Sequence, residues 1–185
     1  MRRIVVAMAV VGLLGAAAPT SAQGPVEGTV AVVEHVGWEV GPCPGVGWVG
    51  TLEISGQGEM DGTYGFKLYH TDFGTDTNSV FVDDWWRWSE YFAVHDALFE
   101  LDEDGNIVDC GPGEVVLQGY DSGVGSLGLN EFWDTGYVAM AAGPFAGLEG
   151  SRTFQLGHFT EFNEAITMPD GNAYPTAFEA SFRVE

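Results

Sequence analysis

Short apolar and aromatic runs alternate with glycine-rich turns along most of this 185-residue chain, which contains 27 glycines. No segment has the three-to-four-residue apolar spacing of an amphipathic helix, and frequent glycine destabilises helices. Runs rich in Val, Phe, Tyr, Trp and Thr between turn residues are typical of β-strands. The pattern therefore predicts an all-β chain. The expected strands are Thr29–Val40, Trp48–Ser55, Thr63–Thr71, Val80–Val94, Leu98–Asp102, Ile107–Asp109, Glu114–Gly119, Gly136–Ala142, Ser151–Phe162 and Ala177–Val184.

Many short strands at close spacing favour a barrel or a β-sandwich. Asp104-Gly105 lies between two of the shortest runs. This dipeptide indicates a hairpin, because the turn needs residues that accept a positive φ. In either architecture the alternation of residues along a strand decides which side chains reach the interior.

Two of the expected strands carry candidate ligand contacts. In the third strand one face carries Tyr64, Phe66 and His70, and in the ninth the more apolar face carries Phe154 and His158. We expect these five side chains to face the interior and to contact a ligand. Neither an H-x-H nor an H-E-x-x-H spacing is present, so no metal site and no cofactor is predicted.

The segment from residue 85 to residue 95 is aromatic on both faces, so it either packs on both sides or lines a cavity with one of them. One face carries Trp85, Arg87, Tyr91 and His95. Trp85 is a further candidate ligand contact. Arg87, Tyr91 and His95 are the candidate catalytic residues, because a cation, a phenol and an imidazole on one wall could stabilise an oxyanion and move a proton. The alternative is a solvated outer face on which the stem of Arg87 covers Trp85.

The N-terminus has the order of a secretory signal peptide. Arg2 and Arg3 are followed by an apolar run over Ile4–Ala18 and by the small residues Thr20-Ser21-Ala22. The apolar run is shorter than the roughly 20 residues that span a bilayer. Residues 1–22 are therefore predicted to be a signal peptide and residues 23–185 a single domain, secreted to the extracellular space or the periplasm.

The chain is strongly acidic, with 27 Asp and Glu against 6 Lys and Arg and a formal net charge of −21. Loss of the signal peptide would leave Lys67 and three arginines as the basic side chains. Such a field repels phosphate backbones and anionic lipid, so nucleic-acid and membrane partners are not expected. We interpret the acidity as a means of staying soluble in a salty or acidic medium. A surface that collects cations is the alternative.

Cys43 and Cys110 are the only cysteines. An even pair in an exported protein predicts one disulfide, which would stabilise the fold by about 4 kcal/mol in the chain-entropy model. The acidic run Asp102–Asn106 looks like a calcium loop, but Ile107 and Gly113 stand where an EF-hand requires Gly and Glu. A hairpin turn explains that run better.

A glycine-rich segment carries a resemblance to a known family. Gly143, Phe145, Gly147 and Gly150 form a G-x-F-x-G-x-x-G turn that follows a hydrophobic strand and precedes another. This segment resembles the late hairpin of the dirigent and allene oxide cyclase barrel superfamily. The strand Ala177–Val184 also lies where that family has its last one.

Two earlier segments resemble the family's opening strands in outline, and one segment departs from its pattern. The outline matches are Gly50-Thr51-Leu52 and Gly62–Phe66. Met140-Ala141-Ala142 stands where the family usually has Gly-Gly-Thr. The resemblance implies an eight-stranded antiparallel, calycin-like barrel whose apolar lumen holds one small organic ligand. Members of the family act in cyclisations or couplings, but their catalytic positions do not map one by one onto this chain.

Together these features predict a secreted acidic barrel that binds a small apolar organic molecule in its lumen. The enzymatic form of this hypothesis is an isomerase or cyclase of the allene oxide cyclase type. The alternatives are a non-catalytic module for carbohydrate or lipid and a structural surface protein. A carbohydrate module would use exposed aromatic platforms, for which Trp85, Trp86 and Trp88 are candidates. The sequence does not indicate an oligomeric state.

Overall fold

The computed structural model describes residues 24–69, 79–82, 85–168 and 170–185, so the predicted signal peptide and His70 lie outside the described residues. The elements of the described chain are strands, apart from two short 3-10 turns. The strands are β1 (Val26–Glu34), β2 (Val46–Ile54), β3 (Gly62–Tyr69), β4 (Ser79–Val82), β5 (Trp85–His95), β6 (Val115–Ser126), β7 (Glu131–Ala141), β8 (Arg152–Thr167) and β9 (Ala173–Val184). The turns are η1 (Gly58–Met60) and η2 (Gly143–Phe145).

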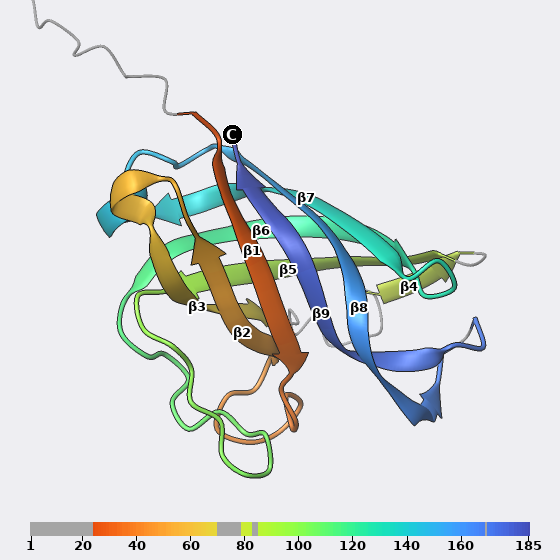
Figure 1. The fold of residues 1–185 in the computed structure, drawn as a ribbon. Coiled ribbons are helices and arrows are strands. Elements are labelled where there is room, and N and C mark those ends of the chain that lie inside the picture. The colour runs from red at the N-terminus through yellow and green to blue at the C-terminus, as the bar shows by residue number, and fades with distance from the viewer. Residues whose placement is uncertain (1–23, 70–78, 83–84, 169) are drawn as a thin grey trace, which may run out of the picture.

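The strands form a closed antiparallel barrel (Figure 1). Around the cylinder the order is β3-β2-β1-β9-β8-β7-β6-β5, and β5 pairs with β3 to close it. The barrel thus has the eight antiparallel strands that the family resemblance implied, and closure removes its free sheet edges. The short β4 pairs with the beginning of β5 as an additional strand.

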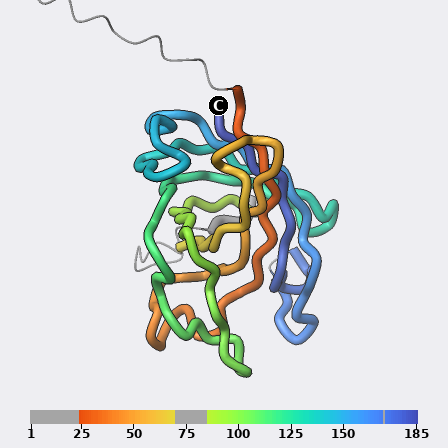
Figure 2. Tube along the Cα trace, turned by 60° about the vertical axis from the view of Figure 1, so that its left-hand side comes forward, coloured from red at the N-terminus to blue at the C-terminus, as the bar shows by residue number. Residues whose placement is uncertain are grey.

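The first and last described strands lie side by side, because β1 pairs with β9 along almost its whole length. Figures 1 and 2 show that the beginning of β1 and the end of β9 lie next to each other at one end of the barrel. Two long loops, β1–β2 and β5–β6, project together from the wall (Figure 2). The disulfide between Cys43 and Cys110 joins these loops with a Cα–Cα distance of 5.5 Å, which confirms the predicted pairing.

One half of the barrel interior is a packed apolar core. The ring centroids of Phe66, Phe92 and Phe182 lie 6.0–6.3 Å apart, and all three side chains are fully buried. At the adjacent end η1 and η2 cover the barrel, where Tyr64 stacks edge-on against Phe145 at 5.1 Å. Each fully buried side chain of this size contributes about 1.5–3 kcal/mol of burial free energy. This half closes the barrel at the end that carries the two turns.

Glycines make room for the largest interior rings. Gly119 on β6 lies opposite Phe92 on β5, and Gly157 on β8 lies opposite Phe132 on β7. A Cβ atom at either glycine would collide with the opposite ring. The alternation of glycine and aromatic residues therefore allows ring-filled strands to sit at normal ladder spacing.

A second, smaller core lies outside the barrel wall. The β5–β6 loop covers the outer face of β2 and β3, where Val46, Val49 and Ile107 are buried around the disulfide. Lys67 is buried in the same place, donates a hydrogen bond to the Cys110 carbonyl at 2.7 Å, and lies 4.9 Å above the Tyr69 ring. Burial lowers the pKa of Lys67 to about 8.

Several predicted strand boundaries were wrong. The first strand ends at Glu34 because a turn region with positive-φ glycines follows. The segment predicted as Val80–Val94 is two antiparallel strands, β4 and β5. The two short runs around Asp104-Gly105 form the predicted turn, with Gly105 at φ 82°, but only one bridge of the ladder. The second half of β6 was missed, because its Gly and Ser residues have low strand propensity.

Candidate functional site

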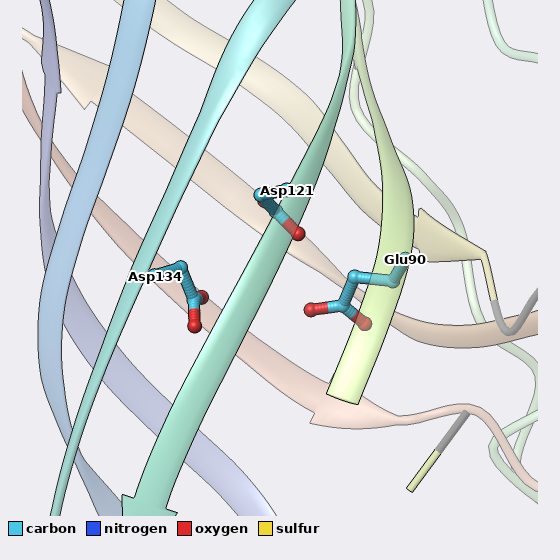
Figure 3. A group of neighbouring side chains, drawn as sticks. All are labelled: Glu90, Asp121 and Asp134. Carbon is cyan, nitrogen blue, oxygen red and sulfur yellow. The ribbon is translucent and has the colours of Figure 1, made fainter. Parts of the chain in front are cut away.

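Three carboxylates meet inside the other half of the barrel. Glu90 comes from β5, Asp121 from β6 and Asp134 from β7, and their side chains point toward one another between these adjacent strands (Figure 3). One carboxylate oxygen of each residue lies within 4.8 Å of the others. All three residues are buried, with exposed fractions of 6%, 1% and 3%.

Strand register brings the three acids together. Glu90 pairs directly with Asp121, and Asp134 pairs with Gly123, two residues further along β6. Residues two apart on a strand share a face, so all three side chains are directed inward. A Cβ atom at Gly123 would collide with Asp134 and with the Trp88 ring, so glycine is needed there to admit the cluster.

A glutamine and a tryptophan supply the polar contacts of the cluster. Gln155 on β8 donates a hydrogen bond from Nε2 to Oδ2 of Asp121 at 3.1 Å. The indole N–H of Trp88 donates to Glu90. The remaining buried oxygens have no hydrogen-bond partner in the described structure, namely Oδ1 of Asp121, Oδ1 of Asp134 and Oε1 of Gln155.

Burial raises the pKa of each acid in the cluster. It raises the pKa of Asp121 to about 7, against the opposing effect of the Gln155 hydrogen bond. Burial, and then the charges of Asp121 and Asp134, hold the pKa of Glu90 well above its usual range. Burial and the neighbouring Asp121 do the same for Asp134. The cause is that a carboxylate loses its hydration inside the barrel while no described basic side chain lies against it.

An aromatic pocket adjoins the cluster at the end of the barrel opposite η1 and η2. Glu90 and Asp134 line one side of it, and Leu68 lies four residues along β3 from the Tyr64 that contacts η2. The pocket holds a cavity of about 30 Å³. By this measure a water molecule needs roughly 10–15 Å³, so there is room for about two. The aromatic wall consists of Trp48, Trp86, Trp88, Phe132, Phe159 and Phe178.

The structure places the predicted catalytic residues outside this interior. Arg87 is exposed and Tyr91 is 40% exposed, and both lie on the outer wall with the half-buried Trp85. Trp85 packs edge-on against the exposed Trp133 at 5.4 Å. The expectation of a lumenal face was wrong for these residues, because the opposite face of β5, with Trp86 and Glu90, is the one that the barrel encloses.

His95 is buried but does not face the pocket either. It pairs with Gly65, which the β5–β6 loop covers, and its ring packs edge-on against Phe99 at 5.1 Å. Nδ1 lies 3.2 Å from the Pro112 carbonyl. Burial, and then the nearby Lys67, lower the pKa of His95. His95 belongs to the small outer core and lies apart from the carboxylate cluster.

The predicted ligand contacts divide into two groups. Tyr64 and Phe66 face the interior as expected, but they belong to its packed apolar half. His158 is exposed and Phe154 is half-buried, because the inward face of β8 is the other one, which carries Thr153 and Gln155. The choice of the more apolar face of β8 was therefore wrong. His70 lies outside the described residues.

Sequence reasoning missed the cluster. None of its four residues was predicted as a site residue, namely Glu90, Asp121, Asp134 and Gln155. Their spacing along the chain matches no motif, because proximity comes from ladder pairing between strands. The one usable signal is an acid two residues before a glycine on the same strand face, as at Asp121 and Gly123.

Comparison of this chain with protein-family models, with curated proteins and with solved structures found no match. The resemblance to the dirigent and allene oxide cyclase superfamily therefore stays a prediction. Within the described part of the chain, no helix has the length and apolar character needed to cross a membrane.

Proposed function

We propose that this protein is a secreted barrel that binds a small aromatic molecule with one polar group in the pocket beside the carboxylate cluster. The observation that carries the proposal is the composition of the pocket, in which six aromatic side chains surround the buried Glu90 and Asp134. Flat apolar walls with a few convergent polar groups are typical of small-molecule sites. A barrel filled only for stability has no use for the two acids.

The pocket sets a limit on the size of the ligand. Its cavity of about 30 Å³ is far below the roughly 300–1,000 Å³ of sites for drug-sized molecules. A single-ring ligand would therefore enter by displacing Trp88, which is only partly buried and packs against Trp86 at 5.0 Å and Phe132 at 5.9 Å. The size of the cavity therefore restricts the small organic ligand expected from the sequence to a molecule with a single ring.

Two observations support secretion. The Cys43–Cys110 disulfide is typical of proteins that leave the reducing cytosol. The predicted signal peptide would deliver the chain to such a compartment.

The isomerase or cyclase form of the hypothesis would use the buried acids. A carboxyl kept protonated by burial can donate a proton to a bound molecule. Glu90 and Asp134 line the pocket and have raised pKa values, so they replace Arg87 and Tyr91 as the candidate proton donors. Native mass spectrometry of material secreted by the producing organism would identify a bound molecule. If that molecule is a substrate, the wild type should convert it and Glu90→Gln should convert it more slowly.

The binding proposal is tested by saturation-transfer NMR with phenol, benzoate and benzylamine as probes. We expect at least one of them to bind with one-to-one stoichiometry. Leu68→Phe, which fills the pocket, should weaken that binding at least tenfold, whereas Trp133→Phe on the outer wall should leave it unchanged. If no probe binds, or if Leu68→Phe and Trp133→Phe behave alike, the pocket is not a ligand site.

A further inference from the structure

We propose that Glu90, Asp121 and Asp134 bind one divalent cation inside the barrel, with the side-chain oxygen of Gln155 as an additional ligand. The cation site does not depend on the proposed function. Only the further step, in which the cation holds the polar group of an organic ligand, rests on that function.

The spacing of the three carboxylates fits a single ion. Calcium lies about 2.3–2.6 Å from its oxygen ligands, so two oxygens on one ion are at most about 5 Å apart. One oxygen each of Glu90, Asp121 and Asp134 lies within 4.8 Å of the others. The three come from adjacent, hydrogen-bonded strands, so the backbone holds this spacing without a ligand.

Gln155 provides a separate observation that points to a ligand. It is only 3% exposed, and its amide reaches the cluster, because Nε2 donates to Asp121 at 3.1 Å. Its Oε1 has no hydrogen-bond partner in the described structure. It also pairs with Asp134 across the ladder between β7 and β8. A buried amide oxygen is normally satisfied, and a cation at the cluster would satisfy it.

The charge of the cluster also has to be neutralised, because no basic side chain of the described residues is near it. Among the described residues the only ion pair joins Arg183 and Glu185 on the surface. Lys67, the single lysine, lies outside the barrel wall against the Cys110 carbonyl. Three buried carboxylates must be neutralised by protons or by a bound cation, because an isolated buried charge is too costly to persist.

The donor atoms select the type of cation. Carboxylate and amide oxygens suit calcium, magnesium and manganese, whereas zinc prefers the nitrogen and sulfur ligands that the cluster lacks. Magnesium requires a near-ideal octahedron and usually keeps several waters. The adjoining cavity of about 30 Å³ has room for about two waters, which suits calcium better.

A cation here would define the chemistry of the organic ligand. Glu90 and Asp134 line the aromatic pocket, so the free coordination positions of the ion face it. The ligand would then carry an oxygen donor such as a carboxylate. Benzoate should bind only when calcium is present, and benzylamine, which would pair with the free carboxylates, should compete with calcium.

The test is isothermal titration calorimetry at pH 8. Calcium chloride is added to the mature protein, residues 23–185, after treatment with EDTA and dialysis. We expect one calcium per chain and a rise in the thermal midpoint. Asp121→Asn and Asp134→Asn should each weaken calcium binding at least tenfold, and magnesium should bind at least tenfold more weakly than calcium. Glu53→Gln removes an acid from the exposed outer face of β2 and should bind calcium as the wild type does.

The outcomes separate the two proposals. Absence of calcium binding, or equal binding by wild type and Asp134→Asn, overturns the cation site, and equal affinity for magnesium overturns its assignment to calcium. If the Asn variants do not fold, Gln155→Ala leaves the charge unchanged and should still weaken binding; unchanged affinity then overturns the site. If calcium binds and no aromatic probe does, the proposed function fails and the cation site stands. If EDTA leaves the binding of the aromatic probe unchanged, only the proposal that the cation holds the polar group of the organic ligand is overturned.

Discussion

The two halves of the barrel interior are built by the same strands, but only one of them holds buried carboxylates among its aromatic rings. Toward η1 and η2 the interior is filled with rings such as Phe92, and two residues back along β5 it holds Glu90. Both halves gain free energy from buried rings, but only the acidic half also loses the hydration of three carboxylates. This unfavourable contribution to stability is the reason for proposing a ligand site in the acidic half. Three variants test whether the two halves differ in this way.

The largest effect is expected in the apolar half. Phe92→Ala removes a fully buried ring that contacts Phe66 and Phe182, so it should lower the free energy of unfolding by about 3–5 kcal/mol. Urea denaturation monitored by tryptophan fluorescence measures this loss. Tyr137→Ala removes an exposed ring from the outer wall and should cost less than about 0.5 kcal/mol. Similar losses in the two variants would mean that the apolar half is not the main source of stability.

The acidic half should make stability fall as pH rises. The pKa of Asp121 is about 7 in the folded protein against an ordinary 3.8, so the folded state holds this proton more tightly than the unfolded state. Its contribution is present in acid and is lost as the pH rises from about 4 through 7. At roughly 1.4 kcal/mol per pKa unit, a rise from 3.8 to about 7 makes this loss about 4 kcal/mol at pH 8 without a bound cation.

The measurement is urea denaturation in EDTA at pH 5 and pH 8. Asp121→Asn should remove this part of the pH dependence and be more stable than wild type at pH 8, while Glu53→Gln should retain it. A pH dependence that Asp121→Asn leaves unchanged would show that surface repulsion, and not the cluster, destabilises the protein in base.

The smallest effect is expected at the glycine that admits the cluster. Gly123→Ala puts a methyl group against Asp134 and Trp88, so it should cost about 1–3 kcal/mol and displace the Asp134 carboxylate. Gly147→Ala, at a turn glycine with φ 96° and open space around it, tests backbone strain without a collision. Calcium titration distinguishes the two, since only Gly123→Ala should weaken binding. Unaltered binding in Gly123→Ala would indicate that Asp134 is not a ligand.

Much of the fold was predictable because it depends on local pattern. The alternation of Tyr64 and Phe66 with polar neighbours identified the inner face of β3, and the pair of cysteines identified the disulfide. The family resemblance supplied the number of strands. By contrast, the inner faces of β5 and β8 were assigned incorrectly, since both faces of β5 are aromatic and the enclosed face of β8 carries Thr153 and Gln155.

The site was hidden for a related reason. A rule that sends the more apolar face inward fails at β8, where the enclosed Gln155 donates a hydrogen bond to the buried Asp121. No sequence spacing links Glu90 to Asp121 and Asp134, which lie 31 and 44 positions beyond it. Their proximity depends on the register of two strand pairs, and register is set by the whole sheet.

Charge, strand propensity and cysteine pairing are properties of composition or of short segments. They were therefore enough to predict an acidic, all-β chain with one disulfide. The enclosed face of β5, the closure of the cylinder by β3 and β5, and the meeting of three acids inside it are seen only in the folded barrel. Closure and register are collective: each strand's inner face is set by its neighbours, and the cluster exists only where the inner faces of three strands coincide.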